Sequence, residues 1–130
     1  MGLSDGDTLS VLREGKAVKV RLHGVDTPES KQAFGARARQ FASEMAFNKV
    51  VTVIIYDTDQ YGRLVGEVLL PDRRSLNQEL VRAGMAWWYR QYAPKETILQ
   101  QLEAEARAAK RGLWSDPHAV APWAFRKERR

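Results

Sequence analysis

The chain has 130 residues, of which 44% are hydrophobic and 28% charged, enough for a single domain with a sizeable core. It has no cysteine and two histidines, which excludes disulfides and thiolate metal sites and argues against structural zinc. The sequence shows neither an apolar run of about 18 residues nor a recognisable signal peptide, and it leaves the compartment open.

The net charge of +5 and the pI near 9.7 favour an anionic partner such as nucleic acid, through contacts to phosphate. Residues 126–130, however, contribute a net +3 through four basic side chains and one acidic. A basic tail in solvent would explain much of the charge, so charge alone is weak evidence for nucleic-acid binding.

Strands are expected at residues 9–13 and 17–23, joined by a turn at 14–16. A helix at 34–48 follows from apolar residues at helical spacing, and β-branched residues predict a strand at 50–56. Further expected elements are a strand at 64–70, a helix at 76–83 and a short fifth strand at 85–89. A helix at 98–109 carries Glu103 and Arg107 as a pair on its solvent side.

We expect one domain over residues 1–130, with an irregular tail at 115–130 and, at its start, either a truncated first strand or an open sheet edge. Five short strands with a helix after the third are compatible with a small barrel of the OB type, although other α+β arrangements fit the pattern.

The densest charge lies where the second strand ends, at Arg21, and in the loop that follows, which carries Asp26 and Glu29. Loops on a rigid scaffold are common places for chemistry. Asp5 and Asp7 fall on the same side of an extended chain, but an ordinary Asp-Gly turn explains them equally well. Arg63 follows a polar turn and, taken alone, is more typical of a solvated charge.

Taken together, these motifs resemble the staphylococcal nuclease (thermonuclease) family. The resemblance rests on five blocks in the expected order: residues 5–8 (DGDT), 21–29 (RLHGVDTPE), 59–63 (DQYGR), 77–84 (NQELVRAG) and 112–114 (GLW). It extends over nearly the whole chain. It implies a mainly β, α+β fold, with a five-stranded OB barrel and three helices, and a calcium-dependent nuclease that acts on DNA, RNA or both.

The resemblance also implies a calcium site. Asp7 and Asp26 would bind Ca²⁺ through their carboxylates and Thr27 through its backbone carbonyl, with Asp5 behind them as a supporting residue. Oxygen ligands of this kind, completed by water, suit a hard cation.

By the same resemblance, Arg21 and Arg63 would bind the scissile phosphate and Glu29 would act on the attacking water. Arginine suits the first role because its fork binds phosphate bidentately and remains charged. Tyr61 and, more weakly, Tyr92 would contact the nucleotide, and the products would carry a 3′-phosphate.

Two departures from the family pattern, Gln60 in place of a lysine and Arg90 near an aromatic position, predict altered affinity or nucleotide preference rather than lost chemistry. His23 is interpreted as structural or solvated, and Trp87 and Trp88 as residues of the core and the barrel rim. The main alternative is a non-catalytic module of the same fold that binds nucleic acid or protein. We expect a monomer, and a dimer joined through a strand edge is a further hypothesis.

Overall fold

The computed structural model describes the backbone of residues 2–128 and the side chains of residues 6–128. Its main sheet has the strand order β1-β2-β3-β6-β5. The bounds are β1 Gly2–Asp5, β2 Thr8–Arg13, β3 Lys16–Leu22, β6 Leu64–Leu69 and β5 Thr52–Thr58. Strands β3 and β6 are parallel, and the other neighbours are antiparallel. A two-stranded sheet pairs β4 (Val25–Asp26) with β7 (Trp87–Trp88).

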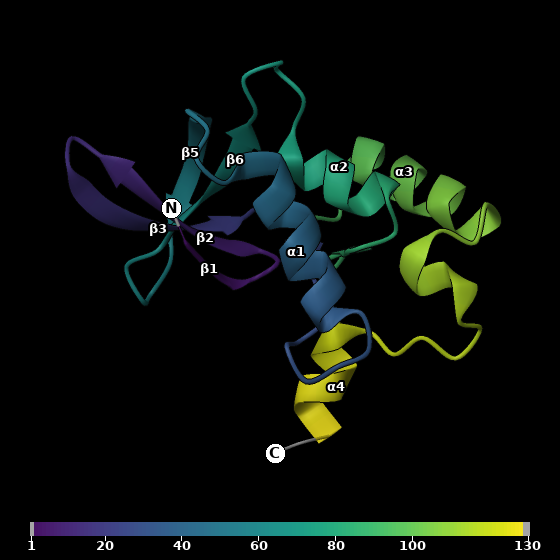
Figure 1. Ribbon diagram of the computed structural model, residues 1–130. Coiled ribbons are helices and arrows are strands. Elements are labelled where there is room, and N and C mark those ends of the chain that lie inside the picture. The colour runs from purple at the N-terminus through teal and green to yellow at the C-terminus, as the bar shows by residue number, and fades with distance from the viewer. Residues whose placement is uncertain (1, 129–130) are drawn as a thin grey trace.

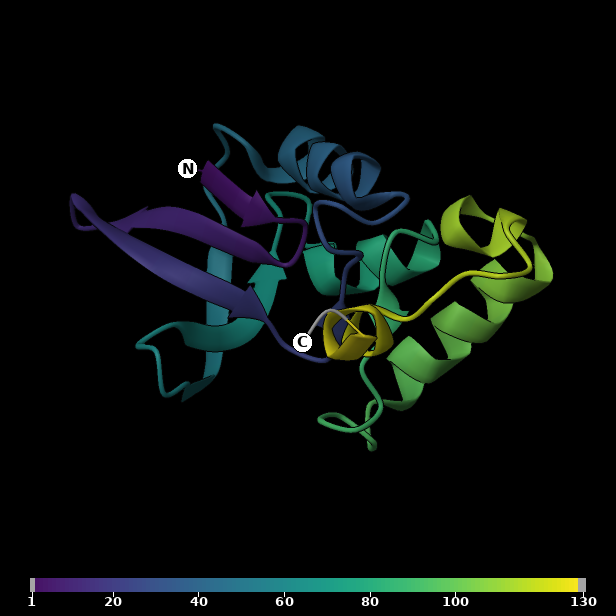
Figure 2. The same ribbon diagram turned by 90° about the horizontal axis from the view of Figure 1, so that it is seen from below.

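Helices cover one side of this sheet and extend beyond it (Figures 1 and 2). They are α1 Gly35–Ala46, α2 Leu76–Arg82, α3 Thr97–Ala108, the 3₁₀ turn η1 Gly112–Ser115, and α4 Pro122–Glu128. The core between the layers is aliphatic. It includes fully buried side chains from the strands and from α1 and α2, among them Leu9, Val20, Leu22, Val68, Leu76 and Leu80.

The hairpin between β2 and β3 fixes how the residues of these two strands pair, and this pairing places Arg21. Glu14 and Gly15 take positive φ values of 52° and 80°, the conformation that suits a tight hairpin turn. The resulting register places Thr8 opposite Arg21. Arg21 therefore lies next to the turn that contains Asp7.

Helix α2 begins and ends as the sequence indicates. The Ser75 hydroxyl accepts a hydrogen bond from the Gln78 N–H, and Gly84 takes φ +74° just after the helix. Inside the helix, the buried amide of Asn77 accepts from the Val68 N–H and donates to the carbonyls of His23 and Gly66. This side chain ties α2 to β6 and to the end of β3.

The sheet does not form the expected closed barrel. Among residues 2–128, β1 pairs with β2 alone and β5 with β6 alone, so these two strands leave the sheet with free edges. β1 has four residues and does not reach β5. The predicted fifth strand is reduced to Trp87–Trp88, which pairs with β4 instead of joining the main sheet.

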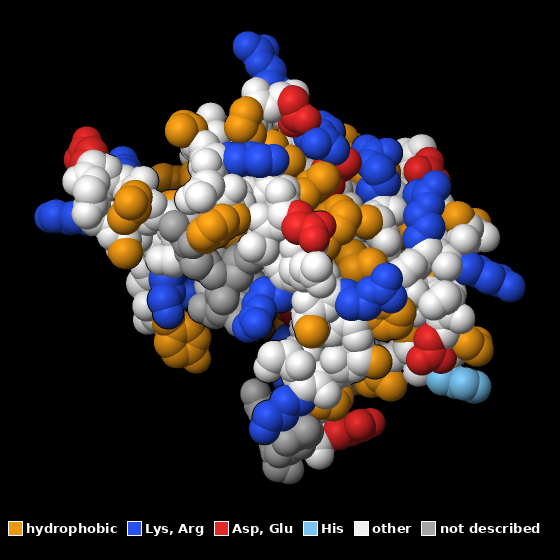
Figure 3. All heavy atoms as spheres, viewed as in Figure 1, with side chains coloured by type: hydrophobic (Ala, Val, Ile, Leu, Met, Phe, Trp, Pro, Cys, Tyr) orange, Lys and Arg blue, Asp and Glu red, His pale blue; other side chains and the backbone are white. Residues whose placement is uncertain are grey.

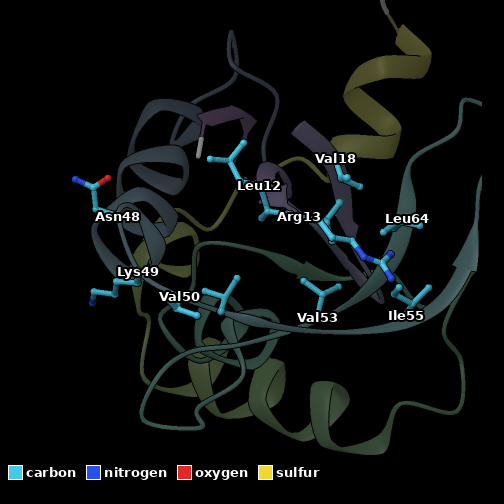
Figure 4. Close-up of a pocket in the computed structure, with 12 residues that line it drawn as sticks. Leu12, Arg13, Val18, Asn48, Lys49, Val50, Val53, Ile55 and Leu64 are labelled. Atoms are coloured by element: carbon cyan, nitrogen blue, oxygen red, sulfur yellow. The ribbon is translucent and has the colours of Figure 1, made fainter. Parts of the chain in front are cut away.

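An apolar groove lies along the open side of the sheet. Figure 4 shows side chains of β2 and β3 facing those of β5 across it, including Leu12, Val18, Val53 and Ile55. Its volume is about 520 Å³. Leu12 and Ile55 are respectively 71% and 47% exposed, which shows how incompletely the described chain covers this face.

The C-terminal segment is more regular than predicted. Residues 112–115 and 122–128 are helical, so the described chain has four α-helices, not three. Pro122 occupies the first position of α4, where its fixed φ and missing N–H cost nothing. Its side chain is fully buried, which anchors the helix start. The sequence reading missed α4 because a helix of seven residues shows too little periodicity.

The prediction for Glu103 also needs correction. Its ion pair with Arg107 is present, with Arg107 Nη2 3.3 Å from Glu103 Oε1. Glu103 is nevertheless buried, because its Oε2 accepts the backbone N–H of Trp88 at 2.7 Å. The carboxylate therefore joins α3 to β7 and does not lie on the solvent side.

Basic side chains are spread over several elements on the face shown in Figure 3 and do not gather in one patch. Among the described residues, no helix has the length and apolar character that crossing a membrane requires.

Candidate active site

A cleft of about 780 Å³ lies beside the ends of β3 and β6. Its lining brings together every site residue that the sequence analysis named, except Asp5. These residues are Asp7, Arg21, Asp26, Thr27, Glu29, Tyr61, Arg63 and Tyr92. The side chain of Asp5 lies outside the described residues.

Hydrogen bonds join the turn at Asp7 to the end of β3, which carries Arg21, and to the segment that carries Asp26 and Glu29. The Leu22 N–H donates to the Asp7 carbonyl at 2.8 Å, and the Thr27 N–H donates to Asp7 Oδ2 at 3.0 Å. Gly6 packs so closely that an added Cβ would lie 3.0 Å from Thr27 Cγ2. The turn at Asp7 and the loop after β4 are therefore held against each other.

Arg21 lies between the two aspartates. Its Nη1 is 3.7 Å from Asp7 Oδ2, its Nη2 is 3.8 Å from Asp26 Oδ1, and Nη1 donates to the Leu22 carbonyl at 2.7 Å. The ion-pair distances are too long for strong hydrogen bonds. The guanidinium is thus oriented by its own strand while some of its hydrogen-bonding capacity faces the cleft.

Asp26 lies in the most strongly perturbed environment of the site. Burial raises its pKa from 3.8 to about 6, the hydrogen bond from Arg126 acts against this rise, and the nearby charge of Asp7 adds to it. Burial also raises the pKa of Tyr89, with a further contribution from the Asp26 charge. Burial of the Asp26 carboxylate therefore outweighs the nearby guanidinium groups of Arg126 and Arg21 in setting this pKa.

Glu29 is positioned by the loop before α1. Its N–H donates to Gln32 Oε1 at 3.1 Å, and its carbonyl accepts from the Gln32 N–H at 2.9 Å. A Cβ at Gly35 would lie 2.0 Å from the Glu29 carbonyl oxygen, so glycine is required there. The helix start and the glutamate backbone are therefore in direct contact.

Arg63 is held by an acid within its own hairpin. Its Nε donates to Asp59 Oδ2 at 2.7 Å, and its backbone N–H donates to Asp59 Oδ1 at 2.9 Å. Desolvation opposes ionisation of Asp59, but the hydrogen bonds from Arg63 and Tyr61 together outweigh it and lower the pKa of Asp59. The guanidinium also lies 5.6 Å from the centre of the Tyr61 ring.

Arg126 is a cleft residue that the sequence analysis assigned to a basic tail. Its Nη2 lies 2.8 Å from Asp26 Oδ2, and its Nη1 lies 2.7 Å from Glu29 Oε1 and 3.2 Å from Asp26 Oδ1. These contacts raise its pKa, chiefly through the hydrogen bond to Asp26. One signal was available: Pro122 marks a helix start that places Trp123 and Arg126 three residues apart on one face.

Aromatic side chains border the cleft. Tyr61 and Tyr92 are 75% and 74% exposed, as contacts to a ligand would require. Tyr89, which was not predicted, packs edge-on against Tyr92 at 4.6 Å and stacks on Trp123 at 5.2 Å. His23 contacts Tyr56 edge-on at 4.9 Å, and Trp87 is buried, as expected for a core residue.

The donor set is suited to a hard cation, although it is small. Asp7 and Asp26 are close enough for their charges to interact, and Thr27 Oγ1 is buried with no hydrogen-bond partner among residues 6–128. Within residues 6–128, no three His, Cys, Asp or Glu side chains form a cluster that could hold a metal. A calcium ion here would take two carboxylates and complete its coordination with backbone oxygen and water.

Comparison with known proteins finds a matching family and several relatives. Residues 19–116 match the family model described as "Staphylococcal nuclease homologue". An "Uncharacterized endonuclease" from Escherichia coli is 45% identical over 122 residues, which are 94% of this chain and 79% of that protein. The "Micrococcal nuclease" of Shigella flexneri is 42% identical over 132 residues, covering 95% of this chain and 76% of that protein.

A plant protein, "Staphylococcal-like nuclease CAN1" of Arabidopsis thaliana, is 35% identical over 115 residues, 88% of this chain and 35% of its own length. The family match covers well over half of the chain, and the bacterial relatives match along most of their own length. The chain therefore belongs to the staphylococcal nuclease family.

Proposed function

We propose that this protein is a calcium-dependent nuclease that hydrolyses phosphodiester bonds in DNA, RNA or both and leaves 3′-phosphate ends. The observation that carries the proposal is the convergence of Arg21, Arg63, Glu29 and the aspartate pair on one cleft. The names of the related proteins, which include "Micrococcal nuclease", support a nuclease. The calcium requirement and the product ends follow from the family resemblance.

The two arginines would bind the scissile phosphate and stabilise the charge that develops on its oxygens. Arg21 lies in β3 and Arg63 in the turn just before β6, and each is oriented by a hydrogen bond within its own segment. Fixed donors of this kind need little reorganisation during the reaction. Removing one such donor typically costs about 10²–10³ in kcat.

Glu29 would accept a proton from the attacking water or orient that water. Its side chain is 31% exposed, so solvent reaches it. Asp7 and Asp26 would hold the cation, which supplies Lewis-acid polarisation of a phosphoryl oxygen when bound. Tyr61 and Tyr92 would contact the nucleotide from the exposed rim.

The test is hydrolysis of denatured DNA and of RNA with calcium and then with excess chelator. We expect cleavage with calcium, loss of cleavage with chelator, and a phosphate at the 3′ end of each product. The product ends are checked with a polymerase, which should extend them only after a phosphatase has removed the 3′-phosphate.

A folded protein that binds nucleic acid without cleaving it would refute the proposal and favour the non-catalytic binding module. Cleavage that continues in excess chelator would support the nuclease activity but refute its calcium dependence.

A further inference from the structure

The guanidinium of Arg126 is hydrogen-bonded to two carboxylates that the proposed reaction needs. Its guanidinium is within 2.8 Å of Asp26 and within 2.7 Å of Glu29, one a proposed cation ligand and the other the proposed base. Contacts this short between charged groups are among the strongest hydrogen bonds in proteins. In this arrangement the positive charge of Arg126 balances the carboxylates of Asp26 and Glu29, as a bound metal ion would.

The helix that carries Arg126 is anchored independently of this contact. Pro122 is fully buried, and the ring of Trp123 stacks on Tyr89 and lies edge-on to Trp87 at 5.5 Å. In Figure 1, α4 lies at the bottom of the molecule, below α1. The Arg126 side chain is 37% exposed, so its guanidinium can leave the acids by rotation while α4 stays in place.

A divalent cation on Asp26 and the guanidinium of Arg126 cannot share the same carboxylate oxygens. Like charges at contact distance repel, so binding of the cation must release Arg126 from Asp26. The released guanidinium remains in the cleft that Arg21 and Arg63 also line. A phosphate in that cleft is the partner that would then satisfy it.

We propose that Arg126 is a third phosphate-binding arginine, which Asp26 and Glu29 hold until a divalent cation binds Asp26. The inference rests on the proposed function and makes a further claim: cation and phosphate bind cooperatively because Arg126 passes from the acids to the phosphate. The cation alone must compete with an internal guanidinium, whereas cation and phosphate together leave every charge paired.

The experiment compares the wild type with Arg126→Gln, and Lys127→Gln serves as the matched control. Lys127 is the exposed next residue of the same helix, and its substitution removes the same charge without touching the acids. Calcium is titrated by calorimetry in the absence of nucleotide. Binding of thymidine 5′-monophosphate, which has a phosphate but no diester bond to cleave, is then measured at saturating calcium.

For Arg126→Gln we expect calcium affinity to rise on the order of tenfold and nucleotide affinity at saturating calcium to fall by a similar factor. Lys127→Gln should match the wild type within about twofold in both titrations. Arg126→Lys keeps the positive charge but loses the planar fork of the guanidinium. Its calcium and nucleotide affinities should lie between those of the wild type and those of Arg126→Gln. Thermal melting of each variant verifies that the fold is retained.

Equal calcium affinity in the wild type and in Arg126→Gln would refute the claim that Arg126 competes with the cation for Asp26. Tighter calcium binding with unchanged nucleotide affinity would overturn the phosphate-binding role. If none of the proteins binds calcium, the proposed calcium dependence fails, and this inference fails with it. That result is distinct from the other two, in which the wild type binds calcium and Arg126 alone was misjudged.

Discussion

Replacing Asp26 by asparagine should stabilise the metal-free protein at neutral pH. Asp26 is 1% exposed, and burial raises its pKa from 3.8 to about 6, so the folded state binds a proton more tightly than the unfolded state does. Ionising Asp26 therefore opposes folding above pH 6. That penalty disappears as the pH falls through 6 toward 3.8, because both states then become protonated.

The size of the effect follows from the same values. The difference between 3.8 and about 6 corresponds to about 3 kcal/mol, at roughly 1.4 kcal/mol for each pH unit. Asp26→Asn should thus raise the free energy of unfolding by up to about 3 kcal/mol at pH 8 and change it little at pH 4. With a urea m value of about 2 kcal/mol/M, the midpoint at pH 8 should shift upward by about 1.5 M.

The assay is urea unfolding with chelator present at pH 8 and pH 4, followed by tryptophan fluorescence. Asp59→Asn is the control with the opposite sign, since the pKa of Asp59 is lowered and its charge is stabilising. An Asp26→Asn variant that is less stable than the wild type at pH 8 would refute the reasoning. It would mean that the ion pairs with Arg126 and Arg21 outweigh the cost of burying the carboxylate.

Three further substitutions test particular contacts. Asn77→Ala leaves buried backbone groups such as the Val68 N–H without their partner and should cost about 2–4 kcal/mol in urea unfolding; a smaller loss would mean that water replaces the amide. Gly35→Ala places a Cβ 2.0 Å from the Glu29 carbonyl, so nuclease activity should fall together with the melting temperature, and an unchanged melting temperature would contradict this contact. Arg63→Lys keeps the charge but loses the fork, and kcat should fall about 10²-fold with the fold intact; full activity would exclude a phosphate-binding role.

The local elements were largely predictable because their signals are local. β-Branched runs and apolar residues at helical spacing placed the expected strands and helices within about two residues of their observed bounds. Barrel closure depends on which edges meet in space, and no local pattern in β1 or β5 encodes that. The Trp87–Trp88 run pairs with β4 for the same reason, because pairing partners are chosen by tertiary packing.

The sequence predicted which residues line the proposed site, but not the charge contacts that Arg126 makes there. The family motifs named the acids, arginines and tyrosines that the structure brings to one cleft. They could not reveal Arg126, whose contact with Asp26 spans 100 residues, because the charged segment around it reads as a solvated tail. Tyr89 was missed similarly, since its stacking on Trp123 depends on α4.

The most direct test of the central claim is the calcium-dependent hydrolysis of denatured DNA by Glu29→Gln, with Glu105→Gln as the matched control. Both substitutions remove one negative charge with little change in shape. Glu29 lines the cleft, whereas Glu105 is exposed on α3. The account predicts a loss of at least about 10² in kcat for Glu29→Gln and none for Glu105→Gln. Equal activity in the two folded variants would contradict it.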